Sequence, residues 1–463
     1  HGPVELGGTI QTAGNQSYLD TATLINTTEI QAAGGSFEGG LVGAGNDLTL
    51  NINNTITIAD GSGVNNLVSV GETILTGTIN TTGSQTYQSD VTIEGDVELN
   101  AVGDISFSDE VFGNQNGSAG NPDLTINTQA DTTFGGTVSN LATLTTDAGG
   151  STIAKADITT TGNQTYNDEF VLNTNLTLTG GNASFTAGID GDGNDLTLNF
   201  TGDATLDGGS TNISGINNLT SLGGVAANGT ITTSGAQSFE GNATLIGNTT
   251  LVGPSATLAG TFDGQGHDLT IDYTSPTTIS SSGGNISNFT SVGDVLLNTT
   301  DFETIGSQTF EGNVTLTGDT MLTGTSGSFA NGLDGDGHSL TLNYFNTTTI
   351  DGNSIFSDLN DLTSHGPVEL GGTIQTAGNQ SYLGAATLIN TTEIQAAGGS
   401  FEGGLVGAGN DLTLNINNTI TIADGSGVNN LTSVGETVLT GTINTTGSQT
   451  YQANVTIEGD VEL

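Results

Sequence analysis

The sequence predicts an all-β protein folded as a right-handed parallel β-helix (a β-solenoid), and three observations support this prediction. Short β-prone runs alternate apolar and polar residues, as in Leu48, Leu50 and Ile52 against Thr49 and Asn51, which is the two-residue period of a half-buried strand. Gly, Asn and Asp separate these runs, and only five prolines interrupt the 463 residues. The sequence also repeats itself at several lengths, which is typical of solenoids.

The longest repeat is a duplication. Residues 365–463 copy residues 1–99 almost without change. Six positions differ: Asp20 becomes Gly384, Thr21 becomes Ala385, Val68 becomes Thr432, Ile74 becomes Val438, Ser89 becomes Ala453 and Asp90 becomes Asn454. Such near identity indicates a recent duplication of a long unit.

A shorter repeat lies inside this unit and is marked by the tripeptide Gln-(Ser/Thr)-(Tyr/Phe). The tripeptide begins at Gln16, Gln85, Gln164, Gln237, Gln308, Gln380 and Gln449, at similar but unequal intervals. These intervals define modules at 14–82, 83–161, 162–234, 235–305, 306–377 and 378–446, with partial modules at both ends. The module at 83–161 is the longest, and we expect its extra length to lie in a Gly/Asn-rich loop at 112–123.

Each module of about 72 residues divides into three phrases of about 23 residues, and we expect each phrase to form one coil. Such a phrase cannot bury its apolar side alone, but strands stacked in register on neighbouring coils can share a narrow core. The handedness rule for parallel crossovers favours the right hand. The sequence therefore predicts one continuous solenoid over residues 1–463, with three coils per module.

The aromatic residue of the tripeptide is expected to fill a recurrent position in the core or at a corner, because buried aromatics serve mostly in packing. An exposed aromatic row that binds sugars is the alternative. The residues concerned are Tyr18, Tyr87, Tyr166, Phe239, Phe310, Tyr382 and Tyr451.

In the alignment of the repeats, His365 stands where the corresponding phrase has Val70, in the middle of a coil. His1, the counterpart of His365, therefore also falls in the middle of a coil, and the same alignment places Leu463 within a coil. We therefore expect the chain to be a window of a longer repetitive protein.

Composition excludes several classes of partner. The chain has 48 acidic residues, a single basic residue (Lys155) and a net charge of −47, which argues against binding nucleic acid or anionic membrane surfaces. The absence of cysteine excludes disulfides and cysteine metal sites. No apolar run approaches the ~18 residues of a membrane-spanning helix.

Three phrases together resemble the repeats of giant secreted adhesins of the filamentous-haemagglutinin type. They are GSQTYQSDVTI (83–93), GAGNDLTLN (43–51) and NNLTSVG (429–435). The resemblance covers the whole chain and implies export to the cell exterior, a right-handed β-helical shaft and a role in adhesion or in a surface fibre. The amino-terminal secretion domain of such proteins is not part of this sequence.

Enzymatic activity is not expected. β-Helical enzymes that cleave acidic polysaccharides by elimination generally need Arg or Lys, and this chain has no Arg and only Lys155. Hydrolysis by two carboxylates needs one particular pair, and near-identical modules do not single one out.

Calcium is the one cofactor that the sequence brings into question. The G-x-G-x-D phrases are similar to calcium-binding nonapeptide repeats, although here they recur only once per module. Tight glycine turns are the simpler explanation. The candidate calcium ligands are Asp190, Asp192, Asp195, Asp334 and Asp336.

Asparagine occurs in many N-x-(S/T) triplets, which are acceptors for N-glycans in secreted proteins. A chain rich in Asn and Thr also produces such triplets by chance. The candidates for glycosylation are Asn26, Asn80, Asn163, Asn175, Asn212, Asn218, Asn285, Asn298, Asn346, Asn390 and Asn444.

The sequence thus predicts a non-catalytic, extracellular structural protein at the cell surface, a stiff and trypsin-resistant shaft of an adhesin, filament or sheath. Expected partners are other copies of the chain and a host or neighbouring cell surface, including its glycans. A repeat face that binds carbohydrate, or a calcium-dependent adhesin, is the alternative. Ice is a weaker candidate ligand than carbohydrate, because the unequal lengths of the modules argue against a regular lattice.

Overall fold

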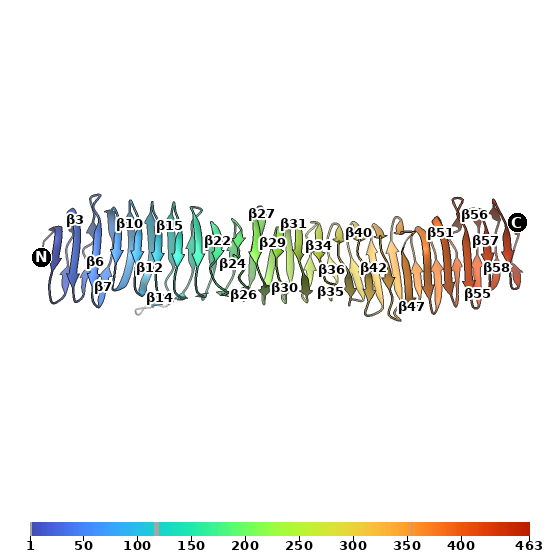
Figure 1. Cartoon of the computed structure of the whole chain (residues 1–463), viewed down its shortest axis with the longest axis horizontal. Helices are drawn as coiled ribbons and strands as arrows, with labels where there is room; N and C mark the ends of the chain where they lie inside the picture. Colours follow the sequence, from blue (N-terminus) through green and yellow to red (C-terminus); the bar gives the residue numbers. More distant parts are fainter. Residues whose placement is uncertain (1, 115–119, 353) are drawn as a thin grey trace. The chain divides into compact units, whose positions relative to one another are not determined.

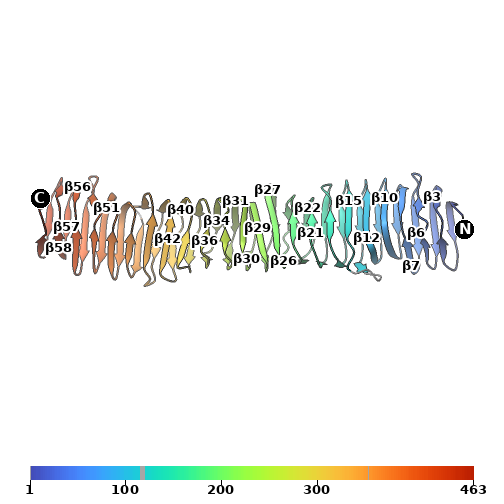
Figure 2. The same cartoon turned by 180° about the vertical axis from the view of Figure 1, so that it is seen from behind.

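The computed structural model describes residues 2–114, 120–352 and 354–463. The chain divides into two compact units, His1–Gln237 and Ser238–Leu463. The described residues form 61 strands and no helix, and each unit is a right-handed parallel β-helix, as the sequence predicts. The strands of each unit lie side by side in Figures 1 and 2.

The first unit has three strand ladders, one on each side of the coil. The first ladder joins β1 (Val4–Gln11), β3 (Ala22–Ala32), β5 (Leu41–Val42) and β8 (Gly61–Val64). The second joins the later part of β3 to β6 (Leu48–Ile52), β9 (Leu67–Ser69) and β11 (Gln85–Tyr87). The third joins β2 (Gln16–Tyr18), β4 (Gly35–Phe37), β7 (Thr55–Ile58) and β10 (Glu72–Thr81).

Longer strands belong to two ladders, because they continue around a corner of the coil. In β10, Thr73 pairs with Ile56 in the third ladder, while Ile79 pairs with Gly61 in the first. The next coil repeats this arrangement in β12 (Val91–Ala101), which is followed by β13 (Ile105–Phe107), β14 (Val111–Asn114) and β15 (Leu124–Thr128).

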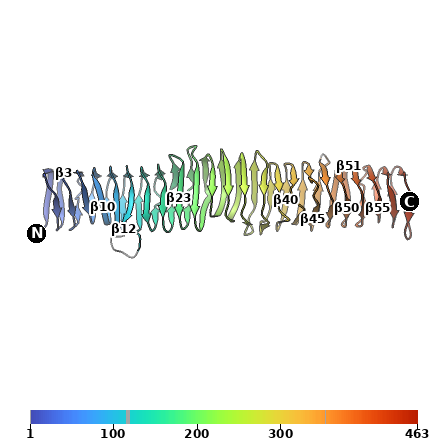
Figure 3. The ribbon, with the colours of Figure 1, turned by 90° about the horizontal axis from the view of Figure 1, so that it is seen from below.

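The second unit is built in the same way. One of its ladders contains β31 (Ala243–Gly253), β34 (Leu269–Tyr273), β37 (Phe289–Ser291), β40 (Ser307–Phe310), β43 (Ser326–Phe329) and β46 (Thr348–Ile350). A second contains β42 (Thr320–Gly324), β45 (Leu340–Tyr344), β48 (Leu362–Ser364) and β50 (Asn379–Tyr382). Figure 3 shows β40, β45 and β50 among the stacked strands of this unit.

The strands form because their residues alternate. In β9 the first and third residues, Leu67 and Ser69, are buried and point into the core, while Val68 between them faces outward. The core is mostly aliphatic and aromatic, and many of its side chains, such as Leu75 and Phe107, are almost wholly inaccessible to solvent. Alternation along each strand thus sorts side chains onto the two sides of a thin wall.

Coils are shorter than the phrase of about 23 residues that the sequence predicts as one coil. Val4 pairs with Ala22, and Leu41 pairs with Gly61, so one turn of the solenoid closes before a phrase is complete. A module therefore contains more than three coils, which corrects the expectation. From Gln16 to Gln85 the chain passes through eleven β-segments, which begin their pairing at Gln16, Ala22, Thr28, Gly35, Leu41, Leu48, Ile56, Gly61, Leu67, Thr73 and Gly77.

Eleven segments are not a multiple of the three in a coil, so the tripeptide changes sides from one module to the next. In the first unit Gln16 lies in the third ladder, Gln85 in the second and Gln164 in the first. In the second unit Gln308, Gln380 and Gln449 also lie in three different ladders. Equal sequence positions therefore do not stack on one another in adjacent coils.

The coil corners are held by side chains that link one coil to the next. The Oδ1 atom of Asp47 accepts hydrogen bonds from the backbone N and the Nδ2 of Asn66, at 3.1 and 2.9 Å. The Oδ1 of Asn66 in turn accepts the backbone N–H of Ser84 at 3.0 Å. These bonds satisfy N–H groups that would lack a partner where the strands turn.

The loop predicted at 112–123 falls partly outside the described residues, which omit 115–119. Its flanks lie in the solenoid, since Val111 pairs with Val91 and Leu124 pairs with Val97. The coil that joins Val97 to Leu124 is longer than the coil before it, and the added residues lie between β14 and β15.

Candidate functional site

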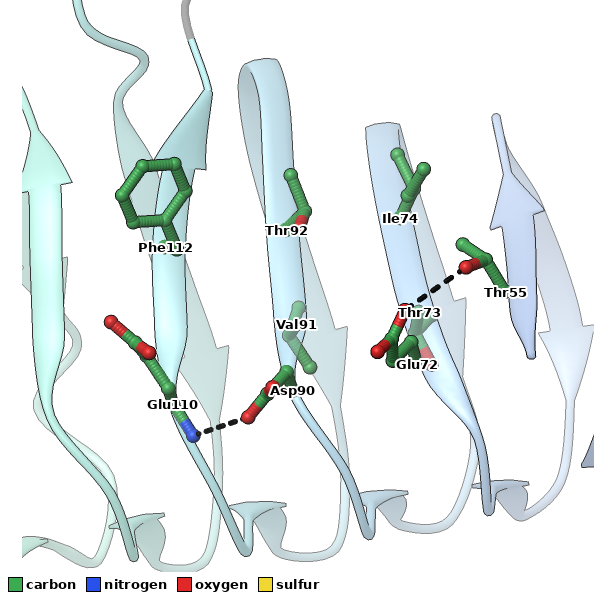
Figure 4. A pocket seen from close by; sticks show the side chains of 9 residues that line it. All are labelled: Thr55, Glu72, Thr73, Ile74, Asp90, Val91, Thr92, Glu110 and Phe112. Carbon is green, nitrogen blue, oxygen red and sulfur yellow. Dashed lines mark hydrogen bonds between the residues drawn. The ribbon is translucent and has the colours of Figure 1, made fainter. Parts of the chain in front are cut away.

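The candidate site is a groove of about 310 Å³ on the third-ladder side of the first unit. Carboxylates from three successive coils, those of Glu72, Asp90 and Glu110, lie along it (Figure 4). Outward side chains of the same strands form the rest of its wall, where Ile74 pairs with Thr92 and Thr92 pairs with Phe112. The Phe112 side chain is 38% exposed.

Three hydrogen bonds hold this row of acids in place, one of them from the Ser139 hydroxyl to Oε1 of Glu110 at 3.3 Å. The Thr55 hydroxyl donates to Oε2 of Glu72 at 3.1 Å, and the backbone N–H of Glu110 donates to Oδ1 of Asp90 at 3.3 Å (Figure 4). The remaining carboxylate oxygens can accept hydrogen bonds from hydroxyl groups of a ligand. An exposed aromatic ring beside such acceptors suits a molecule with both apolar and hydroxylated faces.

The duplicated segment carries a variant of part of this lining, the residues that correspond to Thr55–Thr92. Asn454 stands where the first unit has Asp90, and Val438 stands where it has Ile74. The Nδ2 of Asn454 lies 3.4 Å from Oε1 of Glu436, the residue that corresponds to Glu72. Two of the six differences between the copies therefore change the groove lining, and one of them removes a negative charge.

The aromatic residues of the tripeptide lie in or against the core. Tyr87, Tyr166, Phe310 and Tyr382 are fully buried and Phe239 nearly so, whereas Tyr18 and Tyr451 are half-buried. Each of the rings whose partner is known stacks on an aromatic ring of the next coil, as Tyr87 does on Phe107 at 5.2 Å and Tyr382 on Phe401 at 4.9 Å. Such stacking ties adjacent coils together.

The glutamine is buried in five of the seven tripeptides, and hydrogen bonds engage its amide. In Gln85, Nε2 donates to the carbonyl oxygens of Ile79 and Asn100 at 3.2 and 3.0 Å. Its Oε1 accepts the hydroxyl of Tyr87 at 2.9 Å. Gln164 and Gln380 make the same set of bonds. The Gln and Tyr of the motif thus form a hydrogen-bonded cluster, called the Gln–Tyr bracket below. It joins the strand of the motif to the preceding corner and to the next coil.

Two tripeptides end in Phe instead of Tyr, at Phe239 and Phe310, and for the second the structure shows another source of the hydroxyl. At Gln308 the tripeptide ends in Phe310, which has no hydroxyl, and Oε1 of Gln308 accepts a hydrogen bond from Tyr344 at 2.6 Å instead. Tyr344 lies 36 residues further along, and both partners are buried. The buried glutamine Oε1 therefore needs a tyrosine hydroxyl beside it, and tyrosines at two different sequence positions can supply that hydroxyl.

The G-x-G-x-D phrases form tight turns. In the first, Ala44 and Gly45 both have positive φ (48° and 82°), and the backbone N–H of Asn46 donates to the Gly43 carbonyl at 2.9 Å. Two central residues with positive φ are characteristic of a type I′ turn. The other four phrases have the same two positive φ values at residues 192–193, 265–266, 336–337 and 408–409.

The candidate calcium ligands are engaged in these turns. The Oδ1 of Asp190 accepts the N–H of Asp192 at 3.1 Å, and Oδ1 of Asp334 accepts the N–H of Asp336 at 3.0 Å. Asp195 accepts bonds from the next coil; burial raises its pKa, but hydrogen bonds from Asn218 and Asn217 outweigh this and leave the pKa lowered. Over the described ranges, no group of three or more His, Cys, Asp or Glu residues is placed so that it could hold a metal ion.

The asparagines predicted as glycan acceptors lie at the surface, with one exception. Asn218 is half-buried, its Nδ2 donates to Oδ1 of Asp195 at 2.8 Å and its Oδ1 accepts the N–H of Ala236 at 2.9 Å. The exposed ones are Asn26, Asn80, Asn163, Asn175, Asn212, Asn285, Asn298, Asn346, Asn390 and Asn444.

Coil geometry by itself accounts for some of these N-x-(S/T) triplets. Asn175 stands at a corner and accepts the N–H of Asp195 at 2.9 Å, Leu176 points into the core, and Thr177 faces outward from the strand. Asn218, Leu219 and Thr220 repeat this arrangement. A corner asparagine followed by an inward and an outward strand residue is therefore also an N-x-T triplet.

One carboxylate is buried in a single module and has no buried counterpart in the others. Asp168 is 2% exposed, and its oxygens accept hydrogen bonds from the hydroxyls of Thr146 (3.0 Å) and Thr152 (2.8 and 2.9 Å). Burial raises the pKa of Asp168 to about 6, although the two threonine hydroxyls lower it. The corresponding residues after the other tripeptides are Asp20, Ser89, Gly241, Gly312, Gly384 and Ala453.

Sequence reasoning missed both the groove and Asp168. The groove residues come from three successive coils and lie far apart in the sequence, so no motif marks them. A signal existed for Asp168, because it interrupts a series of mostly small residues at that point of the module.

Comparison with known proteins identifies no relative. No family model matches the chain, and no curated protein and no solved structure is significantly similar to it. The part of the chain that the structure describes contains no helix long and apolar enough to cross a membrane.

Proposed function

We propose that the chain is a non-catalytic segment of an extracellular structural fibre, the shaft of an adhesin or surface filament. The observation that carries this proposal is the continuity of the ladders. In the first unit the second ladder runs without interruption from Thr28 to Ile231. Each coil is thus hydrogen-bonded to its neighbours, so a load along the stack is shared among many parallel bonds.

Other features agree with a structural role. The tripeptide, which is the strongest repeat signal, builds core brackets and aromatic stacks. Most of the corner Asp and Asn side chains bind the backbone of an adjacent coil and are used for stacking. The single basic residue, Lys155, leaves trypsin one cleavage site, which suits an exposed protein.

Location and role are tested together by labelling the source cells with an antibody raised against this chain. We expect label on filaments or a layer outside the cell, in intact and unpermeabilised cells. Label that appears only after permeabilisation would exclude the shaft function. Deleting the encoding segment should shorten the filament while leaving its attachment to the cell intact.

A second candidate function, carbohydrate binding, is favoured by the groove with Phe112 beside the three carboxylates. Binding of the chain to an array of neutral oligosaccharides tests it. We expect Phe112→Ala to abolish any signal that depends on the groove, and Phe345→Ala, which removes another exposed ring, to leave it unchanged. Binding that both variants retain would place the sugar elsewhere.

A further inference from the structure

One side of the second unit carries an unbroken row of hydroxyl groups. One outward residue of each strand in this ladder is Ser or Thr over six successive coils, and these residues pair one to one without a register shift. The row consists of Thr250, Thr270, Thr290, Thr309, Ser328 and Thr349. It ends where Glu369 takes the next place in the ladder.

The row is regular although the sequence is not. The intervals between neighbouring members differ, and the differences are absorbed in the corners and not in the strands. Parallel strands lie ~4.8 Å apart, so the hydroxyls recur at that distance along the row. Unequal module lengths, which argued against a regular lattice at the level of sequence, therefore do not disturb the row.

Most side chains of the row are ordered and available to a ligand, whereas the Thr349 hydroxyl, at its end, donates to Oε2 of Glu369 at 2.9 Å. Threonine is branched at Cβ, which restricts its χ1 angle and fixes both its methyl and its hydroxyl group. Thr270, Thr290 and Thr309 are half-buried between their neighbours, and within the described residues their hydroxyls bond to no other group. The large side chains of these strands, such as Phe289, Phe310 and Phe329, point inward and leave the outer surface even.

Strand propensity alone does not explain the row. Another side of the same coils has the same kind of short strands, but its outward positions are mixed. They read Thr278, Leu296, Thr315, Asp334 and Ser357. A hydroxyl row is therefore not a property of every ladder, although a shorter one, Thr341, Thr363, Ser381, Ser400 and Thr421, follows a third ladder of this unit.

We propose that this row binds the surface of ice. Crystalline water offers oxygen atoms at a repeat close to the strand spacing, and stiff threonines present a matching series of hydroxyl and methyl groups. A polysaccharide is less suited, because the row has no aromatic ring for sugars to stack on and the chain has no Trp. A second copy of the chain is less suited too, since a strip one residue wide falls far below the ~800 Å² per partner of stable interfaces.

The test is thermal hysteresis and inhibition of ice recrystallisation by the whole chain. We expect measurable hysteresis, and a several-fold loss in the double variant Thr290→Tyr/Thr309→Tyr, whose bulky outward rings break the even surface. The control is Thr278→Tyr/Thr315→Tyr, which places the same rings on the mixed side, on the two coils that flank the coil of Leu296, and should leave hysteresis unchanged. Unaltered circular dichroism and melting temperature establish that both variants fold.

Three outcomes would overturn the proposal. The first is a chain without hysteresis or recrystallisation inhibition, and the second is an equal loss in both double variants. The third is binding to insoluble cellulose or chitin that the row variant loses and the control keeps, which would assign the row to a polysaccharide. The proposal does not depend on the shaft function, because antibody labelling and hysteresis measure different properties.

Discussion

At the residue scale, the buried Gln–Tyr bracket explains why the tripeptide recurs. A buried glutamine amide is costly unless its donors and its acceptor are all engaged, and in Gln85, Gln164 and Gln380 the tyrosine that ends the tripeptide engages the acceptor. Gln308 meets the same demand through Tyr344. A buried amide oxygen thus needs a hydrogen-bond donor nearby, and residues at different sequence positions provide that donor in different modules.

This bracket predicts a rescue. Tyr344→Phe should destabilise the second unit by about 1–2 kcal/mol, because Oε1 of Gln308 loses its only hydroxyl donor. Adding Phe310→Tyr restores a hydroxyl at the position that Tyr382 uses in its own module, and should return most of the stability. Urea unfolding of the two single variants and the double variant measures this coupling. Additive effects of the two changes would contradict the bracket.

Asp168 predicts a pH dependence. Its pKa is raised by burial to about 6, so the folded chain binds a proton more tightly than the unfolded chain does. The carboxylate therefore costs no stability below its ordinary pKa near 3.8, an increasing amount as the pH rises to about 6, and a constant amount at higher pH.

Replacing this group by an amide should remove the dependence. At pH 8 we expect Asp168→Asn to stabilise the first unit by about 1–2 kcal/mol, while at pH 4 it should have little effect. Hydrogen exchange of the amides around Thr146 and Thr152 measures the local change. Asp147→Asn, a neighbour whose charge raises the pKa of Asp168, is the control and should give a smaller change of the same sign.

At the element scale, side-chain hydrogen bonds at the coil corners link adjacent coils and make their stability depend on pH. Hydrogen bonds across coils lower the pKa of two corner carboxyls, that of Asp47 through Asn65 and Asn66 and that of Asp411 through Asn430 and Asn429. Their contribution is present above the unfolded pKa and is lost as pH falls through the folded one. Corners thus weaken in acid, in the opposite sense to Asp168.

The glycines of a corner differ in what they tolerate. A Cβ on Gly43 would lie 2.2 Å from the Cα of Val64 in the next coil, so Gly43→Ala forces the coils apart and should cost more than ~2 kcal/mol. A Cβ on Gly45 meets nothing within 4 Å, and Gly45→Ala pays only for its positive φ, about 1 kcal/mol. Melting temperatures of the two variants give the order. A larger loss for Gly45→Ala would contradict the close coil contact.

At the scale of the whole molecule, charge dominates. A net charge of −47 with one basic residue leaves the acids without partners of opposite sign, so they repel one another along both units. Salt bridges contribute little here: within the described residues the closest pair is His338 with Asp319, at 3.8 Å. Mobile cations must therefore provide the screening.

Stability should accordingly rise with ionic strength. We expect the melting temperature to increase as NaCl is added, because screening shortens the range of the repulsion to ~10 Å at 0.1 M. CaCl₂ and MgCl₂ at equal ionic strength should act alike, since Asp190 and Asp334 are occupied by their own turns. A shift specific to Ca²⁺, and lost in Asp190→Asn, would establish a calcium site.

The amino-acid sequence by itself determined the parallel coil, because two-residue alternation and repeated turns are local properties that each module carries in full. It also placed the tripeptide aromatics in packing positions, where the structure puts Tyr87 and Tyr382. Only the tertiary structure decided which residues of different coils meet. The coils are shorter than the phrases of about 23 residues in the sequence, so equivalent residues of successive modules lie in different ladders. Small differences in coil length also add up over a module. The groove at Glu72, the Asp168 pocket and the hydroxyl row depend on that register, which no single repeat contains.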